Sequence, residues 1–433
     1  MAVDFGCIAD DFTGATDIAG ILARTGATVN LRIGVPDATD QLATDDTAAF
    51  EVIALKSRTA PVDEAIAQTT QALAWLQQQG AQRFFWKYCS TFDSTADGNI
   101  GPVSLALMKK LGTDRTLYCP AFPENGRSVY MGYLYVGQQL LNESPMQHHP
   151  LTPMRDANLA RLLAPQIAAV DAADTVGNLL LSDIRQGVAA VTQRLQHYQA
   201  TGVRHIIADA IEADDLSVIA EATHDWPLLT GGSAIAMYLP ALYAQAGLTQ
   251  HTSQSAAPEA PGAGQIVLSG SCSSMTRQQV AAYRSHATSI DVDPLVLARD
   301  ESELPRLIST LQSIPPESPK LIVASADPEQ VKHVQSELGV EAAGTLVESA
   351  LSALAAAAFD TGVRRFVVAG GETSGAVTAQ LGVDRLRIGP EIAPGVPWTY
   401  TRVKGESVAL ALKSGNFGQP DFFHKALTQL ESH

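Results

Sequence analysis

Apolar and polar positions alternate along the first 248 residues with periods that predict strands and helices in turn. Residues 3–8 form an apolar run typical of a buried strand, and apolar residues from Ala15 to Leu22 recur at the i, i+3, i+4, i+7 spacing of one helix face. Gly26 follows where glycine commonly ends a helix. Strands are expected at residues 3–9, 28–35, 51–56, 83–88, 115–119, 203–208 and 227–230. Helices are expected at residues 14–25, 62–79, 100–111, 181–200 and 232–246.

This alternation predicts a largely parallel sheet with helices on both faces, the α/β class of fold. Residues 120–155 interrupt the alternation because prolines and glycines are frequent there. Tyrosines between Tyr130 and Tyr135 suggest a hairpin in this segment. Long insertions of this kind often serve as lids or binding loops, so we expect a functional role for it.

A second α/β pattern begins after a polar segment. Residues 249–264 are rich in Pro, Gly, Ala and Ser and contain little to bury, which is typical of a linker. We therefore expect two domains, residues 1–248 and 265–433, each a largely parallel sheet flanked by helices, with a cleft between them. The second domain should have strands near 265–269, 320–325, 364–369 and 407–412. Its helices should lie near 274–286, 341–360 and 373–381.

Composition and charge exclude several classes of function. Hydrophobic residues make up 46% of the chain, enough for buried cores, and the net charge of −16 without a basic run argues against nucleic acid or an anionic membrane as partner. No apolar run approaches the roughly 18 residues that a bilayer span needs, and the N-terminus shows no signal-peptide pattern. The four cysteines are scattered, as expected for reduced thiols in the cytoplasm. His148 and His149 are expected to be solvated rather than to bind a metal.

Asp10 and Asp11 are adjacent carboxylates at the carboxyl end of the first expected strand. Open α/β sheets bind their ligands at this end of the strands. If both side chains were buried without a partner they would repel each other, and at least one pKa would rise. A site that needs a carboxylate base explains the pair. The alternative is that Asp11 or Thr13 only caps the following helix.

Other strand ends of the first domain carry further polar groups. Lys87 precedes Ser90, Thr91 and Asp93, which together suit a hydroxylated carboxylic acid. Arg58 follows another strand and could clamp a carboxylate with two parallel hydrogen bonds. Alternatively, Arg58 and Lys87 pair with Asp11 or Asp93, which would not exclude a role in the site.

The second domain offers three turns between a strand and a following segment. Gly370 to Gly375 combine glycines, which let a ligand approach the backbone, with the free N–H groups of a helix N-terminus and two hydroxyl side chains. The other two turns are Ser269–Ser274 and Lys413–Gly418. Ordinary turns and helix caps are the alternatives for all three. The chain has neither a P-loop nor a dinucleotide-binding fingerprint.

Taken together, these strings resemble the four-carbon acid sugar kinase family, and within it the 3-oxo-tetronate kinases. The Ser90–Thr95 string is similar to the 3-oxo-tetronate branch, whereas relatives acting on threonate or erythronate carry a Lys-x-Asp-Ser-Thr form. The resemblance covers nearly the whole chain and rests on residues 8–17, 87–95, 98–101, 119–123 and 370–375.

The resemblance implies a sugar-acid-binding domain at 1–248, a nucleotide-binding domain at 265–433, and ATP-dependent phosphorylation of the terminal hydroxyl of a four-carbon acid. A homodimer is one option for the assembly, and the sequence leaves the oligomeric state open. The residues that it implies for ATP binding are Ser269 or Ser271, Gly370, Gly371, Glu372, Thr373, Gly415 and Asn416.

In the mechanism that this resemblance implies, the substrate C4 hydroxyl attacks the γ-phosphorus of ATP and a carboxylate accepts the hydroxyl proton. We assign this base to Asp11, with Asp10 as orienting partner or alternative. Arg58 and Lys87 should hold the substrate carboxylate. Mg²⁺ should bridge the phosphates, with Glu372 orienting it through water, and domain closure should exclude bulk water.

A kinase for threonate or erythronate, within the same family, is the nearer alternative. Two other classes of function also compete with this mechanism. A NAD-dependent dehydrogenase is disfavoured by the missing fingerprint. A non-catalytic sugar-acid-binding protein is disfavoured by the paired aspartates and by the lack of an export signal.

Overall fold

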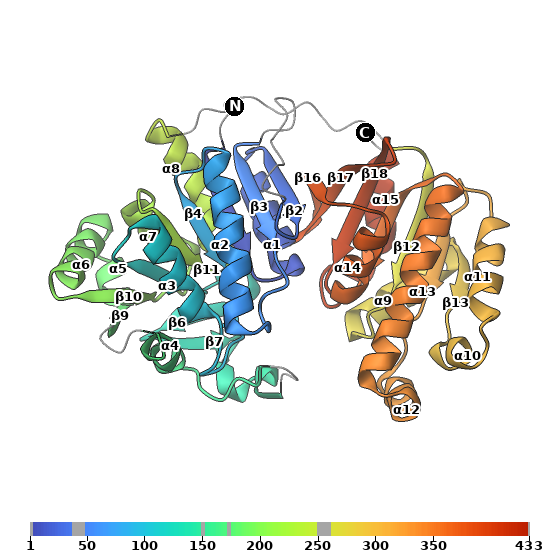
Figure 1. The fold of residues 1–433 in the computed structure, drawn as a ribbon, viewed down its shortest axis with the longest axis horizontal. Coiled ribbons are helices and arrows are strands. Elements are labelled where there is room, and N and C mark those ends of the chain that lie inside the picture. The colour runs from blue at the N-terminus through green and yellow to red at the C-terminus, as the bar shows by residue number, and fades with distance from the viewer. Residues whose placement is uncertain (1–2, 37–47, 149–151, 171–174, 249–260, 432–433) are drawn as a thin grey trace. The chain divides into compact units, whose positions relative to one another are not determined.

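The computed structural model describes residues 3–36, 48–148, 152–170, 175–248 and 261–431 (Figure 1). The chain divides into two compact units, which we call the N-terminal unit (Met1–Ser255) and the C-terminal unit (Ala256–His433). Both consist of a sheet flanked by helices, which confirms the predicted α/β class. Residues 249–260, most of the expected linker, lie outside the described residues, and Gly264 is already the first residue of a strand.

The main sheet of the N-terminal unit is wholly parallel, in the order β2-β3-β1-β4-β11-β5-β10-β9. Its central strand β1 is buried along its whole length. The strands are β1 (Phe5–Ala9), β2 (Val29–Ile33), β3 (Phe50–Ala54), β4 (Phe84–Lys87), β5 (Thr116–Cys119), β9 (Thr175–Leu179), β10 (Val203–Ala208) and β11 (Leu228–Gly231).

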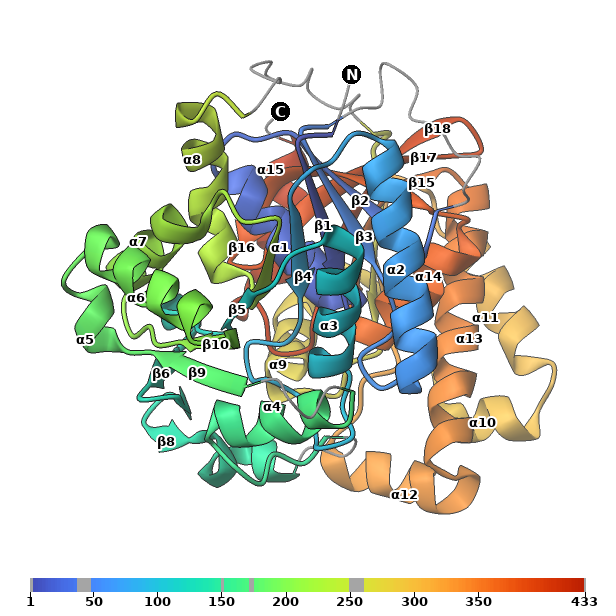
Figure 2. The same cartoon turned by 60° about the vertical axis from the view of Figure 1, so that its left-hand side comes forward.

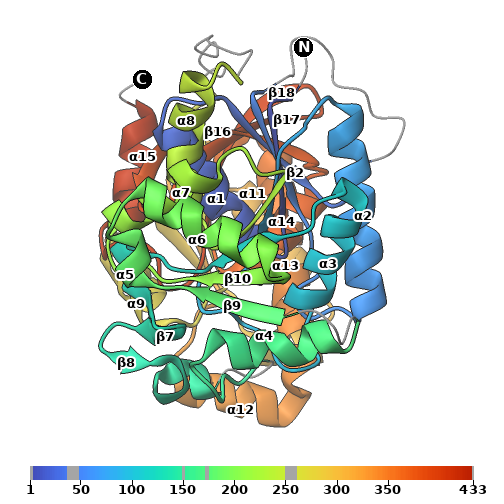
Figure 3. The same ribbon diagram turned by 90° about the vertical axis from the view of Figure 1, so that its left-hand side faces the viewer.

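Helices cover both faces of this sheet. Figure 3 shows α2 and α3 on one side, and α1, α7 and α8 on the other. Gly26, with φ of 83°, ends α1 as its position predicts, because a residue without a Cβ adopts this backbone conformation freely. The helices are α1 (Phe12–Arg24), α2 (Val62–Gln78), α3 (Ile100–Leu111), α4 (Leu159–Ala168), α5 (Leu181–Ile184), α6 (Val188–Ala200), α7 (Ala213–Thr223) and α8 (Leu239–Gln245).

The hairpin expected in residues 120–155 is confirmed. Strand β6 (Arg127–Tyr130) pairs antiparallel with β7 (Tyr133–Val136), and β8 (Gln139–Leu140) extends them to a small separate sheet. Short 3₁₀ turns flank it at Pro123–Asn125, Leu141–Glu143 and Pro145–His148.

Some helix predictions in this unit were wrong in detail. The helix expected at 181–200 is split into α5 and α6 at Gly187, and the one at 232–246 begins as a 3₁₀ turn, Ala234–Tyr238. The sequence pattern missed α4, α7 and β9.

The sheet of the C-terminal unit has the order β13-β14-β12-β15-β18-β17-β16. The first five strands are parallel, whereas β17 and β16 are antiparallel. The sequence pattern missed β13, β16 and β17. The strands are β12 (Gly264–Ser269), β13 (Thr288–Asp291), β14 (Lys320–Val323), β15 (Val363–Ala369), β16 (Arg385–Ala393), β17 (Val396–Val403) and β18 (Glu406–Lys413).

Figure 2 shows α13 beside α11 and α14, and these three helices pack together. On the core face of the sheet, α9 and α15 bury a cluster that includes Val280, Trp398 and Phe423. The helices are α9 (Ser274–Tyr283), α10 (Pro294–Arg299), α11 (Glu303–Gln312), α12 (Pro328–Leu338), α13 (Val340–Asp360), α14 (Gly371–Gln380) and α15 (Phe422–Glu431), with a 3₁₀ turn at Arg284–His286.

Helix α13 corrects one expectation from the sequence. By length and composition alone it could cross a membrane, with a mean hydropathy of 1.5 over its most apolar window. Half of that window is buried inside the structure, and Leu351, Leu354 and Ala358 lie in the core. A helix in the core of a protein can be as long and as apolar as a membrane-spanning helix, and the burial of α13 is typical of a core helix. The sequence expectation that no apolar run approaches 18 residues was therefore wrong for α13.

Candidate active site

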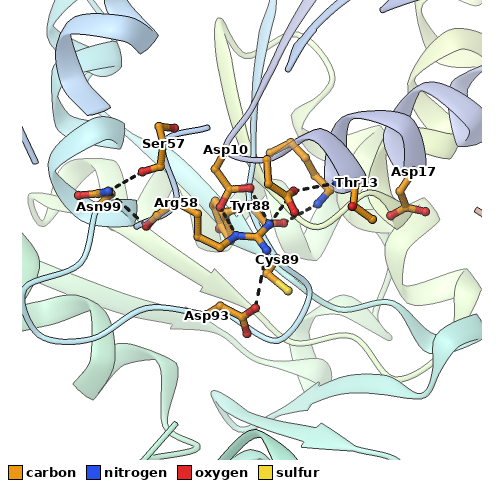
Figure 4. A network of polar contacts seen from close by, with 12 residues as sticks. Asp10, Thr13, Asp17, Ser57, Arg58, Tyr88, Cys89, Asp93 and Asn99 are labelled. Atoms are coloured by element: carbon orange, nitrogen blue, oxygen red, sulfur yellow. Dashed lines mark hydrogen bonds and ion pairs between the residues drawn. The ribbon is translucent and has the colours of Figure 1, made fainter. Parts of the chain in front are cut away.

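The ends of three neighbouring parallel strands bring the predicted acid-sugar residues together in the N-terminal unit. Strand β1 lies between β3 and β4, so their carboxyl ends meet at one edge of the sheet. Asp10 and Asp11 follow β1, Arg58 lies four residues after β3, and Lys87 ends β4 (Figure 4). The structure therefore groups residues that are up to 77 positions apart in the sequence.

Arg58 is the centre of this group. Its Nε and Nη2 donate to the two carboxylate oxygens of Asp10, both at 2.8 Å. Nη2 also lies 2.7 Å from Asp11 Oδ1, and Nη1 lies 3.8 Å from Asp93 Oδ2. The alternative pairing of Arg58 with Asp11 and Asp93 is thus present, and Asp10 takes the two-pronged contact that was expected for a substrate carboxylate.

The loop that carries Arg58 is fixed from two sides. The Asn99 side chain donates to the carbonyl of Ser57 at 2.7 Å (Figure 4). It also donates to the carbonyl of Ala60 at 3.0 Å. The backbone N–H groups of Ser57 and Arg58 donate to the Asp10 carbonyl. A guanidinium on a loop held in this way keeps its orientation without help from a ligand.

Asp10 and Asp11 differ in environment. Asp10 is buried, and burial raises its pKa against the opposing effect of Arg58. The side chain of Asp11 is 30% exposed, and its Oδ1 accepts from the backbone N–H of Gly14 at 2.8 Å. Asp11 is therefore the N-cap of α1, as the alternative interpretation had it, and it also faces Arg58 and solvent.

Lys87 is buried at the end of β4, and its Nζ donates to the Tyr88 carbonyl at 2.8 Å. A Cβ on Gly14 would lie 2.8 Å from this Nζ, so the bare glycine lets α1 begin directly beside the ammonium. Among the described residues no carboxylate forms an ion pair with Lys87, so its expected pairing with Asp11 or Asp93 is absent.

The loop after β4 orients Asp93. Thr91 Oγ1 donates to Asp93 Oδ1 at 2.7 Å, and the buried Phe92 has a φ of 51°, a strained backbone conformation for a residue with a side chain. Ser90 lies beside the turn at Gly232, where an added Cβ would be 3.5 Å from Ser90 Cβ. Strain of this kind often marks functional sites, where the surrounding structure holds it.

Gln166 of α4 is a supporting residue that the sequence did not indicate. Its buried side chain accepts from Gly101 N–H at 2.9 Å and donates to Ser94 Oγ and to the Thr95 carbonyl. Ser94, within the Ser90–Thr95 string, is thus engaged in anchoring its own loop. Pro165 inside α4 disrupts the pattern by which this helix could have been predicted.

Asp17 completes the polar group on α1. Its Oδ2 accepts a hydrogen bond from Ser233, in the turn after β11, and burial raises its pKa. Figure 4 shows Asp17 on α1 beside Thr13. The turn after β11 thus contributes Ser233 to the same edge of the sheet.

In the C-terminal unit three strand ends converge in the same way. The backbone N–H groups of Gly270 and Ser271 donate to the Ala369 carbonyl, and that of Gly370 donates to the Lys413 carbonyl. A Cβ on Gly415 would collide with Ser271 Oγ, and a Cβ on Gly370 would lie 3.3 Å from Ser271 N. Three turns far apart in the sequence therefore meet around Ser271.

Ser269 points elsewhere. It is buried at the end of β12, and its Oγ lies 2.6 Å from Ser325 Oγ. The side chain of Ser271 is partly exposed between Gly370 and Gly415. Of the two serines that the sequence left open, Ser271 is the one that lies among the glycine turns.

The glycine turn after β15 is the N-terminus of α14. Gly370 has a φ of 131°, and a Cβ there would lie 2.9 Å from Thr373 Oγ1, so this position requires glycine. Gly371 and Glu372, the first residues of the helix, are exposed, as is Asn416 in the neighbouring turn. Free N–H groups of a first helical turn are a ready site for phosphate.

A cavity of about 570 Å³ adjoins these turns within the C-terminal unit. Its wall includes Gly270, Glu372 and Thr373 from the turns. Apolar side chains of α10, α12 and α13 complete much of the wall, among them Pro294, Val331, Val334, Val340 and Val347. A cavity with polar turns and an apolar wall has the size and character of a small-molecule site.

Metal ligands are sparse in the described part of the chain. No group of three or more His, Cys, Asp or Glu side chains there could hold a metal ion, and His149 lies outside it. A Mg²⁺ carried by nucleotide phosphates needs only one or two protein carboxylates, and Glu372 at the cavity could supply one. The four cysteines are free; Cys7 and Cys119 are buried and the other two are partly exposed.

Two family models match the chain. Residues 5–239 match a sugar-binding N-terminal domain, and residues 266–423 match a nucleotide-binding C-terminal domain. The 3-oxo-tetronate kinase of Cupriavidus necator is 49% identical over 431 residues, covering 99% of this chain and 97% of the relative. The 3-oxo-tetronate kinase of Salmonella typhimurium is 44% identical over 429 residues, covering 98% and 99%.

Solved structures agree. A Salmonella typhimurium LT2 protein described as a tRNA synthase has a TM-score of 0.87 and 42% identity, with 98% of both chains covered. A Haemophilus influenzae protein has a TM-score of 0.81 and 41% identity, covering 98% of this chain and all of that one. The matches confirm the expectation of a phosphotransferase with an alcohol acceptor. The chain belongs to the family that joins a sugar-binding N-terminal domain to a nucleotide-binding C-terminal domain, and within it to the four-carbon acid sugar kinases, as its motifs indicated.

Proposed function

We propose that this protein transfers the γ-phosphoryl group of ATP to the C4 hydroxyl of 3-oxo-tetronate. The observation that carries the proposal is the group at the end of β1, where Arg58 orients a partly exposed carboxylate, Asp11, in a unit that matches a sugar-binding domain. The curated relatives that bear this activity in their names cover nearly the whole chain.

Asp11 is the proposed base. It combines solvent access with a fixed position, because the Gly14 N–H and Arg58 hold the same carboxylate oxygen. The second oxygen is then left to accept the proton of the substrate C4 hydroxyl as that hydroxyl attacks the γ-phosphorus. Asp10 acts as the orienting partner, since both of its oxygens are engaged by Arg58.

The substrate carboxylate needs cations that are still available. Lys87 has no ion pair among the described residues, and Arg58 retains its Nη1 group, which faces Asp93 at 3.8 Å. We therefore assign the carboxylate to Lys87 first and to Arg58 Nη1 second. Ser90, Thr91 and Asp93 are the proposed contacts of the oxygen-bearing carbons, with Thr91 already bonded to Asp93.

ATP is assigned to the C-terminal unit. The proposed phosphate contacts are Ser271 and the backbone of Gly370, Gly371 and Thr373, with Gly415 and Asn416 on the opposite turn. The adjoining apolar cavity suits the nucleoside. Mg²⁺ bound to the phosphates would offset negative charge, and Glu372 is the proposed protein ligand or water-mediated contact.

The reaction requires the two ligands to meet in line, so the domain closure expected from the sequence stays part of the proposal. The cytoplasmic location and the homodimer also stay predictions. Light scattering on the purified protein tests the homodimer.

An ADP-release screen over four-carbon sugar acids, with and without a 3-oxo group, tests the proposed function. We expect ADP release that depends on the acid and a product with phosphate on C4. Acid-independent ADP release, or none with any acid, would contradict it. The description of one solved relative as a tRNA synthase would suggest RNA as the substrate, but the net charge of −16 does not favour binding of RNA.

A further inference from the structure

The C-terminal unit contains a buried lysine that the proposed function does not use. Lys413 is the last residue of β18 and is 1% exposed. Its Nζ donates to Thr276 Oγ1 at 3.1 Å and to the Gly415 carbonyl at 3.0 Å. Both partners are neutral oxygens, and no carboxylate among the described residues forms an ion pair with this ammonium.

A buried ammonium without a counter-charge is costly, and proteins usually pair such groups. Burial accordingly lowers the pKa of Lys413 to about 8. The elements beside β18 do not compensate it, since none of their charged side chains forms an ion pair with Lys413 among the described residues. Those side chains are Arg364 and Arg365 of β15, Arg402 of β17, Arg277 of α9 and Glu372 of α14; Tyr400 of β17 and Tyr283 of α9 are also ionisable.

Lys413 lies at the turns to which the nucleotide is assigned, which we call the nucleotide turns (Ser269–Ser274, Gly370–Gly375 and Lys413–Gly418). Its carbonyl accepts from the Gly370 N–H, and its ammonium bonds the carbonyl of Gly415, whose Cα lies against Ser271 Oγ. The Gly415 carbonyl also accepts from Ser273 Oγ at 2.6 Å and Thr276 Oγ1 at 2.8 Å. It therefore keeps two donors if the lysine is removed, so the turn does not need Lys413 to satisfy its backbone.

We propose that Lys413 is a positioning residue for the nucleotide phosphates: its ammonium lies behind the Gly370 and Gly415 turns as a positive charge whose anionic partner arrives with the ligand. This inference rests on the assignment of the nucleotide to these turns. It adds a residue to that site that acts through charge and through Gly415 rather than by direct contact.

Lys320 provides a matched control in the same unit. It too is a buried lysine, and burial lowers its pKa. Its Nζ donates to three carbonyls, those of Pro315, Pro316 and Ser318, at 2.7 to 2.9 Å. Lys320 begins β14, whereas Lys413 ends β18, so in a parallel arrangement the two lie at opposite edges of the sheet.

The test is calorimetric binding of ATP and of adenosine to wild type, Lys413→Met and Lys320→Met, together with thermal unfolding of each ligand-free protein. For Lys413→Met we expect ATP affinity to fall about ten- to a hundredfold, the range for losing an interaction with a charged group. Adenosine affinity and ligand-free stability should not fall, because no phosphate is present and no carbonyl is orphaned. Lys320→Met should lose stability and keep its affinity for ATP.

Proton uptake gives an independent readout. Near pH 8 the wild-type lysine is only partly protonated, and phosphate charge should raise its pKa, so ATP binding should take up protons. Titrations in two buffers of different ionisation enthalpy measure this uptake, which Lys413→Met should reduce.

Unchanged ATP affinity in Lys413→Met overturns the proposal. So does a ligand-free Lys413→Met that is less stable than wild type and binds adenosine more weakly, because the lysine would then be structural. If wild type itself shows no ATP binding, the assignment of the nucleotide to this unit fails, and the proposal fails with it.

Discussion

In the N-terminal unit Arg58 pairs with the carboxylates of the candidate site, although Lys87 beside them forms no ion pair among the described residues, whereas in the C-terminal unit the buried cation behind the turns, Lys413, has neutral partners. Arg58 contacts the carboxylates of Asp10 and Asp11 and faces Asp93 before any ligand binds. The nucleotide turns instead offer mainly backbone N–H groups, glycines and hydroxyls, with Glu372 and Asn416 exposed among them, and the lysine behind them, Lys413, has no ion pair in the described residues.

The difference follows from what each site has to do. A base must stand ready at a fixed place, so the N-terminal unit holds its carboxylate in a network that needs no ligand. The phosphates of a nucleotide carry several negative charges, so the hydrogen-bond donors and the lysine of the C-terminal unit can interact with those charges once the nucleotide binds. Each variant described next removes a charge or a contact from the site of one of the two units.

The largest effect is expected for Asp11→Asn. Asparagine can still cap α1, so the fold should persist, but the amide cannot accept the proton. We expect kcat to fall by about 10² to 10⁴, with ATP affinity little changed. Steady-state kinetics and calorimetry measure both. Normal turnover would refute the assignment, and a comparable loss only in Asp10→Asn would exchange the two roles.

Arg58→Lys should have the next largest effect. A lysine keeps the charge but cannot reach both oxygens of Asp10 and also Asp11 in one plane. We expect kcat/KM to fall by roughly ten- to a hundredfold, measured with the acid as varied substrate.

Arg32→Lys is the matched control for that variant. Arg32 is the penultimate residue of strand β2, is paired with the buried Glu51 at 3.1 Å and lies over the Trp75 ring rather than among the carboxylates around Arg58. Its replacement should change stability and leave kcat/KM unaltered. Equal losses in both variants would mean that Arg58 only supports the fold.

Gly371→Val tests the nucleotide side. The valine would stand on the exposed first residue of α14, where we expect phosphate to approach the backbone. ATP affinity should weaken about tenfold or more, as expected for losing a contact to a charged group. In Gly375→Ala, one turn further along the helix, an added Cβ meets nothing within 4 Å. That control should bind ATP normally, and calorimetry that shows no difference between the two would make the turn structural.

The smallest effect is the pH dependence of stability that Lys413 contributes. Its folded-state pKa of about 8 lies below the ordinary value of 10.5, so between these values the unfolded chain binds more protons. The free energy of unfolding therefore increases with pH by at most about 1.4 kcal/mol per pH unit between pH 8 and 10.5. Below this range the lysine is charged in both states, and the full cost of burying its charge lowers the stability of the folded protein. The stability advantage of Lys413→Met over wild type should thus shrink from pH 7 to pH 10 in chemical denaturation. A pH-independent difference would show that the lysine is not destabilised by burial.

Local sequence signals predicted the parts of the site that depend on local structure. The strand, the acidic pair and the helix around Asp11 follow from periodicity and helix-start chemistry within about 20 residues. The Gly370 turn is visible for the same reason. Each of these two predictions depends only on one strand and the helix that follows it in the sequence.

What the sequence could not predict depends on strand order. Ser269 faces Ser325 after β14, on one side of β12, whereas Ser271 lies by the turns that follow β15 and β18, on the other side. Arg58 grips Asp10 because β1 and β3 are neighbours. Gln166 lies on a helix that contains a proline. Lys413 resembles an ordinary strand end in the sequence, and only the contacts of the described residues show that its ammonium has neutral partners.

The ratio of kcat/KM for 3-oxo-tetronate to that for threonate and erythronate tests the central claim most directly. A planar C3 oxygen accepts hydrogen bonds, whereas a C3 hydroxyl brings its own hydrogen into the space beside Ser90 and Thr91, and each mismatch in a closed site costs on the order of 1–3 kcal/mol. The account predicts that the 3-oxo acid is preferred by at least about ten- to a hundredfold. Equal turnover of the reduced acids, or a preference for them, would contradict it.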